Sequence, residues 1–137
     1  MLVQPYLFFD GRCEEALAFY GKAIGAKVKL MRFKESPEQH GPPSATNPAN
    51  AEKIMHAHVE IGDTAFMASD GDCNGKPNLH GFALTLTVAD AAEAQRSFAA
   101  LSDGGETTMP LSKTFFASSF GMLTDRFGVR WMVMAPT

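Results

Sequence analysis

The sequence lacks several features that would point to a specialised class of protein. It has only two cysteines, Cys13 and Cys73, without C-x-x-C spacing, so neither a disulfide framework nor a thiolate metal site is expected. Its net charge is −3, which gives no indication of a basic face for nucleic acid or an anionic membrane. Its apolar runs are no longer than a strand, so no transmembrane helix is predicted.

The composition is otherwise that of an ordinary globular protein. The 137 residues are 45% hydrophobic and 20% charged, which suits one domain or two fused halves that share a core. The first residues, MLVQPYLFFDGRCEEAL, lack the basic start and the small-residue cleavage site of a secretion signal. Since the two cysteines are also expected to be reduced thiols, we predict a cytoplasmic protein.

A strand, a helix and a second strand are predicted in this order at the start of the chain. Val3 to Phe9 is rich in aromatic and β-branched residues, which is typical of a strand. Arg12 to Ile24 places apolar residues at helical spacing, and Gly25 suits the end of that helix. Ala26 to Phe33 alternates apolar and basic residues, which predicts a half-buried strand.

The next segments are predicted to be a loop and a β-hairpin. Lys34 to Lys53 contains four prolines and few large apolar side chains. We interpret it as a long mobile loop, either a lid over a site or a variable surface insertion. Ile54 to Ile61 and Thr64 to Ser69 alternate on either side of Gly62-Asp63, which is the pattern of a hairpin with a two-residue turn.

After a turn-rich linker at about 70–80, the same order of elements is predicted again. Phe82 to Val88 has a strand pattern, and Ala89 to Leu101 has a helix pattern that begins with Asp90 and Glu93 in a capping box. Three more strands are predicted, at Glu106–Leu111, Phe115–Leu123 and Val129–Met134. The β-α-β-β-β order therefore occurs twice in one domain, as modules at about 1–70 and 81–137.

Four motifs follow one another from near the start to near the end of the chain: PYLFFDG at Pro5–Gly11, EEALAFY at Glu14–Tyr20, IMHAHVEIGD at Ile54–Asp63 and DRFGVRW at Asp125–Trp131. With them the chain resembles the PhnB-like branch of the glyoxalase/bleomycin-resistance/extradiol-dioxygenase superfamily. The resemblance implies the α+β vicinal-oxygen-chelate fold, in which two βαβββ modules form a curled mixed sheet around a cleft, commonly in a homodimer. Members of this branch are often labelled demethylubiquinone methyltransferases. No glycine-rich nucleotide loop follows a strand in this sequence, so we do not expect a methyl-donor site.

The resemblance also implies where metal ligands would stand. In the metalloenzymes of the superfamily, the first and last strands of each module supply four ligands to the cleft. Matching the motifs places these positions at Pro5, Met67, Ala83 and Met132. Proline and alanine offer no ligand atom, and a thioether is too soft for the usual divalent ions. We therefore expect no cofactor at the usual site.

The hairpin pattern predicts which side chains share a face with Met67. With Gly62-Asp63 as the turn, Glu60 pairs with Ala65, His58 with Met67, and His56 with Ser69. Because side chains alternate along a strand, one face then carries a set of polar residues and Met67. The set is His56, His58, Glu60, Met67 and Ser69. In the second module, Thr85 is expected beside Ala83, and Arg130 beside Met132.

Several interpretations of these residues remain open. His58 and Glu60 could transfer protons near neutral pH, and with His56 they could instead hold a divalent metal. They could also be hydrogen-bonded polar residues of a wet cleft or a dimer interface. Arg130 could hold an anionic ligand, or it could be an exposed strand arginine.

Two functions follow from these alternatives. The first is a homodimeric binding protein of the bleomycin-resistance type, whose cleft takes a small molecule through His56, Met67, Ser69, Thr85, Arg130 and Met132. The second is a divergent metal-dependent lyase, isomerase or dioxygenase that uses His56, His58 and Glu60.

Overall fold

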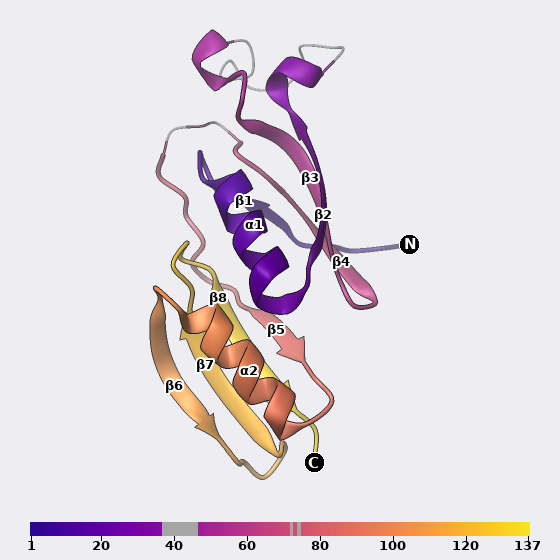
Figure 1. Cartoon of the computed structure of the whole chain (residues 1–137), viewed down its shortest axis with the longest axis vertical. Coiled ribbons are helices and arrows are strands. Elements are labelled where there is room, and N and C mark those ends of the chain that lie inside the picture. Colours follow the sequence, from indigo (N-terminus) through magenta and orange to yellow (C-terminus); the bar gives the residue numbers. More distant parts are fainter. Residues whose placement is uncertain (37–46, 72, 74) are drawn as a thin grey trace. The chain divides into compact units, whose positions relative to one another are not determined.

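The structure is a computed structural model of the chain, and it describes residues 1–36, 47–71, 73 and 75–137 (Figure 1). The chain divides into two units, Met1–Asn78 and Leu79–Thr137. Among the described residues, each unit contains one α-helix and one four-stranded mixed sheet, and neither sheet is closed. The predicted α+β class and the repeated β-α-β-β-β order are confirmed. None of the helices in the described ranges is long and apolar enough to cross a membrane.

In the first unit, the sheet has the strand order β1-β4-β3-β2, with β1 parallel to β4 and the other pairs antiparallel. Helix α1 lies against one face of this sheet (Figure 1). The elements are β1 (Tyr6–Phe8), α1 (Cys13–Ile24), β2 (Lys27–Arg32), the 3-10 helices η1 (Phe33–Glu35) and η3 (Pro48–Asn50), β3 (Ile54–Ile61) and β4 (Thr64–Ser69).

The core of the first unit lies between α1 and the sheet. Leu17 and Tyr20 of α1 are buried, as are Val59 of β3 and Phe66 of β4, which are cross-strand partners. Burial of such side chains stabilises a fold by about 1.5–3 kcal/mol each. Helix α1 ends as predicted at Gly25, whose φ of 72° is a left-handed conformation that costs glycine little.

A buried carboxylate joins three parts of the first unit. Asp70 is 1% exposed. Its Oδ1 accepts hydrogen bonds from the backbone N–H groups of Gly11 (2.6 Å) and Cys13 (2.9 Å), and its Oδ2 accepts one from Ile54 (2.8 Å). The side chain therefore caps the N-terminus of α1 from a distant part of the chain and also anchors the start of β3.

In the second unit, the sheet has the order β5-β8-β7-β6, with β5 parallel to β8 and the other pairs antiparallel. Helix α2 packs on β7 and β8 (Figure 1). As predicted, Asp90 caps α2, and its Oδ1 accepts from the Glu93 N–H at 2.9 Å. The elements are β5 (Leu84–Thr87), α2 (Ala91–Ser102), β6 (Glu106–Ser112), β7 (Ser119–Thr124) and β8 (Arg130–Ala135).

A second buried carboxylate organises this unit. Asp125 is 3% exposed, and its Oδ1 accepts from the N–H groups of Phe127 and Val129 in the turn before β8. Its Oδ2 accepts from the indole Nε1 of Trp131 at 2.9 Å, and this ring is itself 2% exposed. The buried indole N–H and the carboxylate therefore satisfy each other.

Four predicted strands are shorter in the structure, and the late start of two of them has a local cause. The first starts at Tyr6 rather than Val3, and Pro5, which has no N–H, directly precedes it. Phe115 and Phe116 are not part of β7, which starts at Ser119. The Thr114 hydroxyl accepts from the N–H groups of Phe116 and Ala117, so a side-chain turn replaces the start of the predicted strand.

The predicted loop from Lys34 to Lys53 lies partly outside the described residues, since 37–46 are not described. Its two ends contain η1 and η3. Asn47 caps η3, and its side-chain oxygen accepts from the Ala49 N–H at 3.0 Å.

Candidate functional site

The candidate residues lie on one face of each sheet, the face that the helix of that unit does not cover. We call these the open face of the first sheet and the open face of the second sheet. In the first sheet, cross-strand pairing places the buried residues on the face that packs under α1. The residues that alternate with them lie on the open face, and most of these are partly exposed. The open face of the first sheet carries Tyr6, Phe8, Lys27, Lys29, Met31, His56, His58, Glu60, Ala65, Met67 and, although it is buried, Ser69.

The predicted hairpin is confirmed in its register. Glu60 pairs with Ala65 and His58 with Met67, with the turn at Gly62-Asp63. The opposite side of the hairpin packs under α1, as the pattern predicted. Its members are fully or almost fully buried: Ala57, Val59, Phe66 and Ala68.

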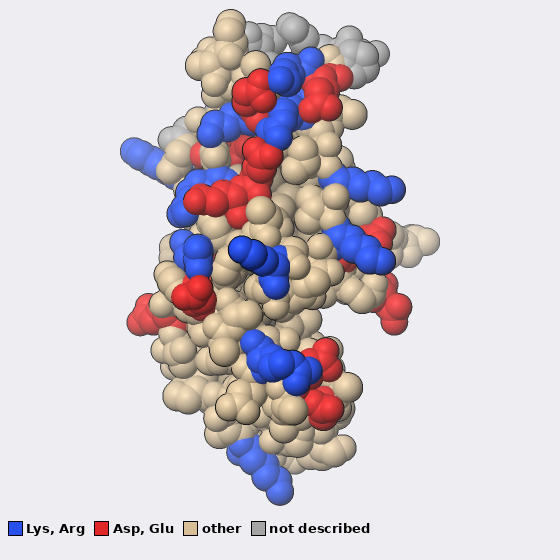
Figure 2. Space-filling model, viewed as in Figure 1, with Lys and Arg blue, Asp and Glu red and all other residues tan. Residues whose placement is uncertain are grey.

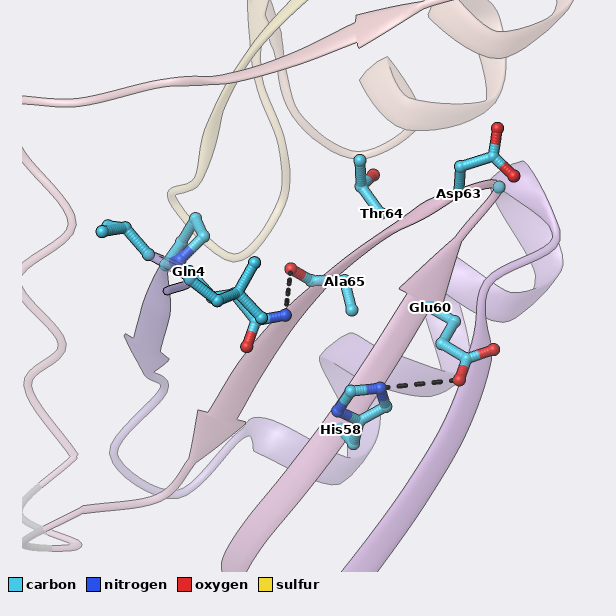
Figure 3. A pocket seen from close by; sticks show the side chains of 10 residues that line it. Gln4, His58, Glu60, Asp63, Thr64 and Ala65 are labelled. Atoms are coloured by element: carbon cyan, nitrogen blue, oxygen red, sulfur yellow. Dashed lines mark hydrogen bonds and ion pairs between the residues drawn. The ribbon is translucent and has the colours of Figure 1, made fainter.

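His58 and Glu60 lie in an open hollow of about 520 Å³ that residues of the first unit form (Figure 3). The two side chains point toward each other, with His58 Nε2 3.5 Å from Glu60 Oε1. Gln4, which precedes β1, points at β4, and its Nε2 donates to the Ala65 carbonyl at 3.4 Å. The full lining is Leu2, Val3, Gln4, Pro5, His58, Glu60, Gly62, Asp63, Thr64 and Ala65.

The hollow has a polar wall and an apolar wall. The His58 and Glu60 side chains are 41% and 52% exposed, so their contact alone adds little to stability. Lys29 is the cross-strand partner of His58, and Lys27 is that of Glu60. A ligand on this face therefore meets positive groups beside one carboxylate, and the apolar N-terminal residues on the other side.

A second pair, which sequence reasoning missed, lies on the same face. Tyr6 Oη and His56 Nδ1 are 3.1 Å apart, and their ring centroids are 5.7 Å apart. The Tyr6 ring also contacts the Phe8 ring, with centroids 4.9 Å apart, although Phe8 is 51% exposed. Tyr6 and Phe8 thus form an aromatic platform next to His56 and Met67.

The structure places the other predicted first-unit residues as follows. Tyr6, rather than Pro5, is in register with Met67, while the Pro5 carbonyl accepts from the Met67 N–H at 3.0 Å. Ser69 is 3% exposed, and its hydroxyl accepts from the Gly71 N–H at 3.1 Å. The Ser69 side chain therefore already has a partner within the unit.

The predicted residues of the second unit share one face of their sheet. Thr85 pairs with Met132, and the Thr85 hydroxyl lies 3.9 Å from the Met132 sulfur. Arg130 begins β8, is exposed, and pairs with Thr124. Ala83 directly precedes β5. The open face of the second sheet carries Thr85, Thr87, Glu106, Met109, Ser112, Phe120, Met122, Thr124, Arg130, Met132 and Met134.

The residues at the four positions that the sequence resemblance gave for metal ligands do not fit a divalent ion. Pro5 and Ala83 have no ligand atom, and Met67 and Met132 offer only thioether sulfur. In the described part of the chain, no three His, Cys, Asp or Glu side chains come together in a group that could hold a metal. His56, His58 and Glu60 do not form such a group.

Neither cysteine forms a disulfide. Cys13 is fully buried in α1. Burial raises the pKa of the Cys13 thiol far above its usual range, and the negative charges of Asp70 and Glu14 raise it further. Cys13 therefore stays protonated at neutral pH and contributes to packing rather than to chemistry.

A network of charged side chains connects α1, β2 and the segment after η3. Arg32 donates two hydrogen bonds to the Glu14 carboxylate, at 3.0 and 2.5 Å, and one to the Glu52 carbonyl at 2.8 Å. Lys34 pairs with the Glu52 carboxylate. Figure 2 shows charged side chains of both signs close together over α1 and the adjoining 3-10 helices. The network holds both ends of the segment that includes residues 37–46.

We predict that Glu14→Gln reduces the loss of stability in acid. The hydrogen bond from Arg32 lowers the pKa of Glu14 below its ordinary value of 4.5. Because the pKa is lower in the folded chain, ionised Glu14 stabilises the fold above about pH 4.5, and this contribution is lost as the pH falls through the folded-state pKa. The effect is small, as for other exposed ion pairs. Urea unfolding from pH 7 to pH 3 measures it.

The control for this prediction is the same change in an Arg32→Ala background. There, Glu14→Gln should no longer alter the dependence of stability on pH. An equal pH effect in both backgrounds would contradict the assignment to Arg32.

Comparison with known proteins identifies the family. A family model described as 3-demethylubiquinone-9 3-methyltransferase matches residues 2–134. The chain belongs to this family. Protein YjdN from Escherichia coli K12 is a relative of this chain. The two sequences are 35% identical over 97% of this chain and 94% of YjdN. The predicted PhnB-like membership is therefore confirmed.

Solved structures of other proteins have the same fold as this member of the 3-demethylubiquinone-9 3-methyltransferase family. Protein PA1353 from Pseudomonas aeruginosa is 41% identical, with a TM-score of 0.85 over 99% of this chain and 98% of that chain. The PhnB protein from Bacillus cereus is 24% identical, with a TM-score of 0.76 over 98% and 99% of the two chains. A glyoxalase/bleomycin resistance protein from Albidiferax ferrireducens, 17% identical with a TM-score of 0.53 over 90% and 89%, shares the fold.

Proposed function

We propose that this protein binds a small organic molecule at the open face of the first sheet, without the usual divalent metal. One observation carries the proposal: aromatic, imidazole and thioether side chains lie together there and remain partly exposed. Tyr6 is 36% and Phe8 51% exposed, whereas the opposite face of the same strands is almost fully buried. Large aromatic groups left exposed next to a hollow are typical of ligand sites.

The polar groups of this face suit a ligand with a planar apolar part and polar substituents. Tyr6 and Phe8 offer ring faces for stacking. His56 and His58 each engage a neighbour through one ring nitrogen, Nδ1 in His56 and Nε2 in His58. A polar partner at one nitrogen orients the ring and leaves the other nitrogen for a ligand. The hollow beside His58 gives such a ligand room.

The methyl transfer that the family description names is not part of this proposal. Helix α1 follows the connection Phe9-Asp10-Gly11-Arg12, and α2 follows Val88-Ala89-Asp90. Neither connection is a glycine-rich loop of the kind that cradles a nucleotide at a helix N-terminus. We also propose, as predicted from the sequence, a cytoplasmic homodimer, and light scattering of the purified protein checks the dimer.

We expect a panel of metabolites and antibiotics to contain a compound that raises the melting temperature saturably, with or without EDTA. For that compound, Tyr6→Ala and His58→Ala should each raise the Kd about tenfold, because each removes a direct contact. Isothermal titration measures this effect. Lys22→Ala, on the exposed last turn of α1, is the matched control and should leave the Kd unchanged.

Two results would contradict the binding proposal: no thermal shift with any compound in the panel, or a shift that EDTA abolishes. The second result would favour the alternative, a divergent metal-dependent lyase, isomerase or dioxygenase that uses His56, His58 and Glu60. The 3.5 Å separation of His58 Nε2 and Glu60 Oε1 favours a role in proton transfer for that alternative.

A further inference from the structure

Three methionines stand in one row across the second sheet. Met109 of β6 pairs with Met122 of β7, and Met122 pairs with Met132 of β8. Residues that are cross-strand partners point to the same face of a sheet. Met132 in turn pairs with Thr85 of β5, so the row crosses all four strands.

These methionines are not part of the core. Met109 is 45% exposed, and Met122 and Met132 are half-buried. The opposite face of the same strands holds the buried side chains under α2, including Leu123 and Trp131. The row therefore lies on a face of the sheet that solvent partly reaches, which packing of a core does not require.

The spacing of the row allows the three sulfurs to meet. Side chains of directly opposed residues start about 4.5–5.5 Å apart, and methionine has three rotatable bonds beyond that point. In the structure the Met132 sulfur turns the other way, toward β5, where it lies 3.9 Å from the Thr85 hydroxyl, so Met132 has to rotate to complete the site. Met122 is central in the row, so its two neighbours can turn toward it from both sides.

We propose that Met109, Met122 and Met132 bind one soft monovalent cation, with Cu(I) as the physiological candidate. Thioether sulfur selects Cu(I) among the biological metals, while Mg²⁺, Mn²⁺ and Zn²⁺ need oxygen, nitrogen or thiolate ligands. The row contains no carboxylate, imidazole or thiolate; its fourth member is Thr85. This site is independent of the small-molecule function proposed for the first sheet.

Silver(I) in a chloride-free buffer is the test ion, because it has the same preference for sulfur and needs no reductant. The whole chain carries Cys73→Ser, which removes the partly exposed thiol as a competing ligand. In protein with ¹³C-labelled methionine methyl groups, one equivalent of Ag(I) should shift the signals of Met109, Met122 and Met132. The signals of Met31 and Met55, in the first unit, should not move, and Zn²⁺ should shift none of them.

Met122→Leu is the decisive variant, because it removes the central sulfur and nearly conserves volume. It should weaken Ag(I) binding at least about tenfold, while Met31→Leu, on the open face of the first sheet, should not change it. Circular dichroism confirms that both variants are folded. The proposal is overturned if the methyl signals of the row do not shift, or if Met122→Leu binds Ag(I) as tightly as the parent.

Discussion

Asp70→Asn is expected to lower the free energy of unfolding by about 3 kcal/mol. The two carboxylate oxygens accept from three backbone N–H groups, of Gly11, Cys13 and Ile54, in a site that is 1% exposed. The amide of Asn keeps one acceptor oxygen and turns an N–H₂ toward a backbone donor. At least one buried donor then loses its partner, and the remaining bonds lose their charge. Urea unfolding followed by far-ultraviolet circular dichroism measures the change.

Asp63→Asn is the matched control for this experiment. It removes the same charge from an exposed residue of the hairpin turn, where substitutions usually change stability by less than about 0.5 kcal/mol. Equal losses in the two variants would show that charge, rather than the buried hydrogen bonds, accounts for the effect. A loss under about 1 kcal/mol for Asp70→Asn would contradict the anchoring role of this residue.

Trp131→Ala should have the largest effect of any single change in the second unit, about 4 kcal/mol. The indole is 2% exposed, so its removal leaves a large cavity under α2 and takes a donor away from buried Asp125. Trp131→Phe fills most of the cavity but still leaves the Asp125 Oδ2 without the indole N–H. We expect an intermediate loss of about 2 kcal/mol for that variant.

The chain has a single tryptophan, so these variants are compared by circular dichroism rather than by fluorescence. Phe115→Ala is the control, because this ring is 96% exposed and its loss should cost less than about 0.5 kcal/mol. If Trp131→Phe is as stable as the parent chain, the hydrogen bond to Asp125 makes no net contribution. If it is as unstable as Trp131→Ala, the hydrogen bond matters more than the packing.

The hairpin was predictable residue by residue because its information is local. Gly62-Asp63 sets the turn, and the turn sets the pairing of His58 with Met67 and of Glu60 with Ala65. The helices were also placed within a few residues, since capping residues such as Asp90 and Gly25 act within one turn of the chain.

The residues that sequence reasoning missed depend on contacts between distant segments. Tyr6 and His56 are 50 positions apart, and they meet only because β1 pairs with β4 in parallel. Asp70 acts on the backbone of residues 57 and 59 positions away. An aspartate in a turn-rich segment has no local pattern that separates such an anchor from an ordinary loop residue. The alternation of polar residues in β3 did predict that His58 and Glu60 share a face.

The strand β6 is a place where copies of this protein could pair edge to edge in solution. It is one of the two edge strands of the second sheet, and nearly all of its residues are exposed. An exposed edge of seven residues can recruit a strand from another molecule and start aggregation. Pro110 has no N–H to offer, and the pairing of β6 with β7 shifts register on both sides of Met109. These irregularities make β6 a poor template, so they protect the chain from uncontrolled sheet growth.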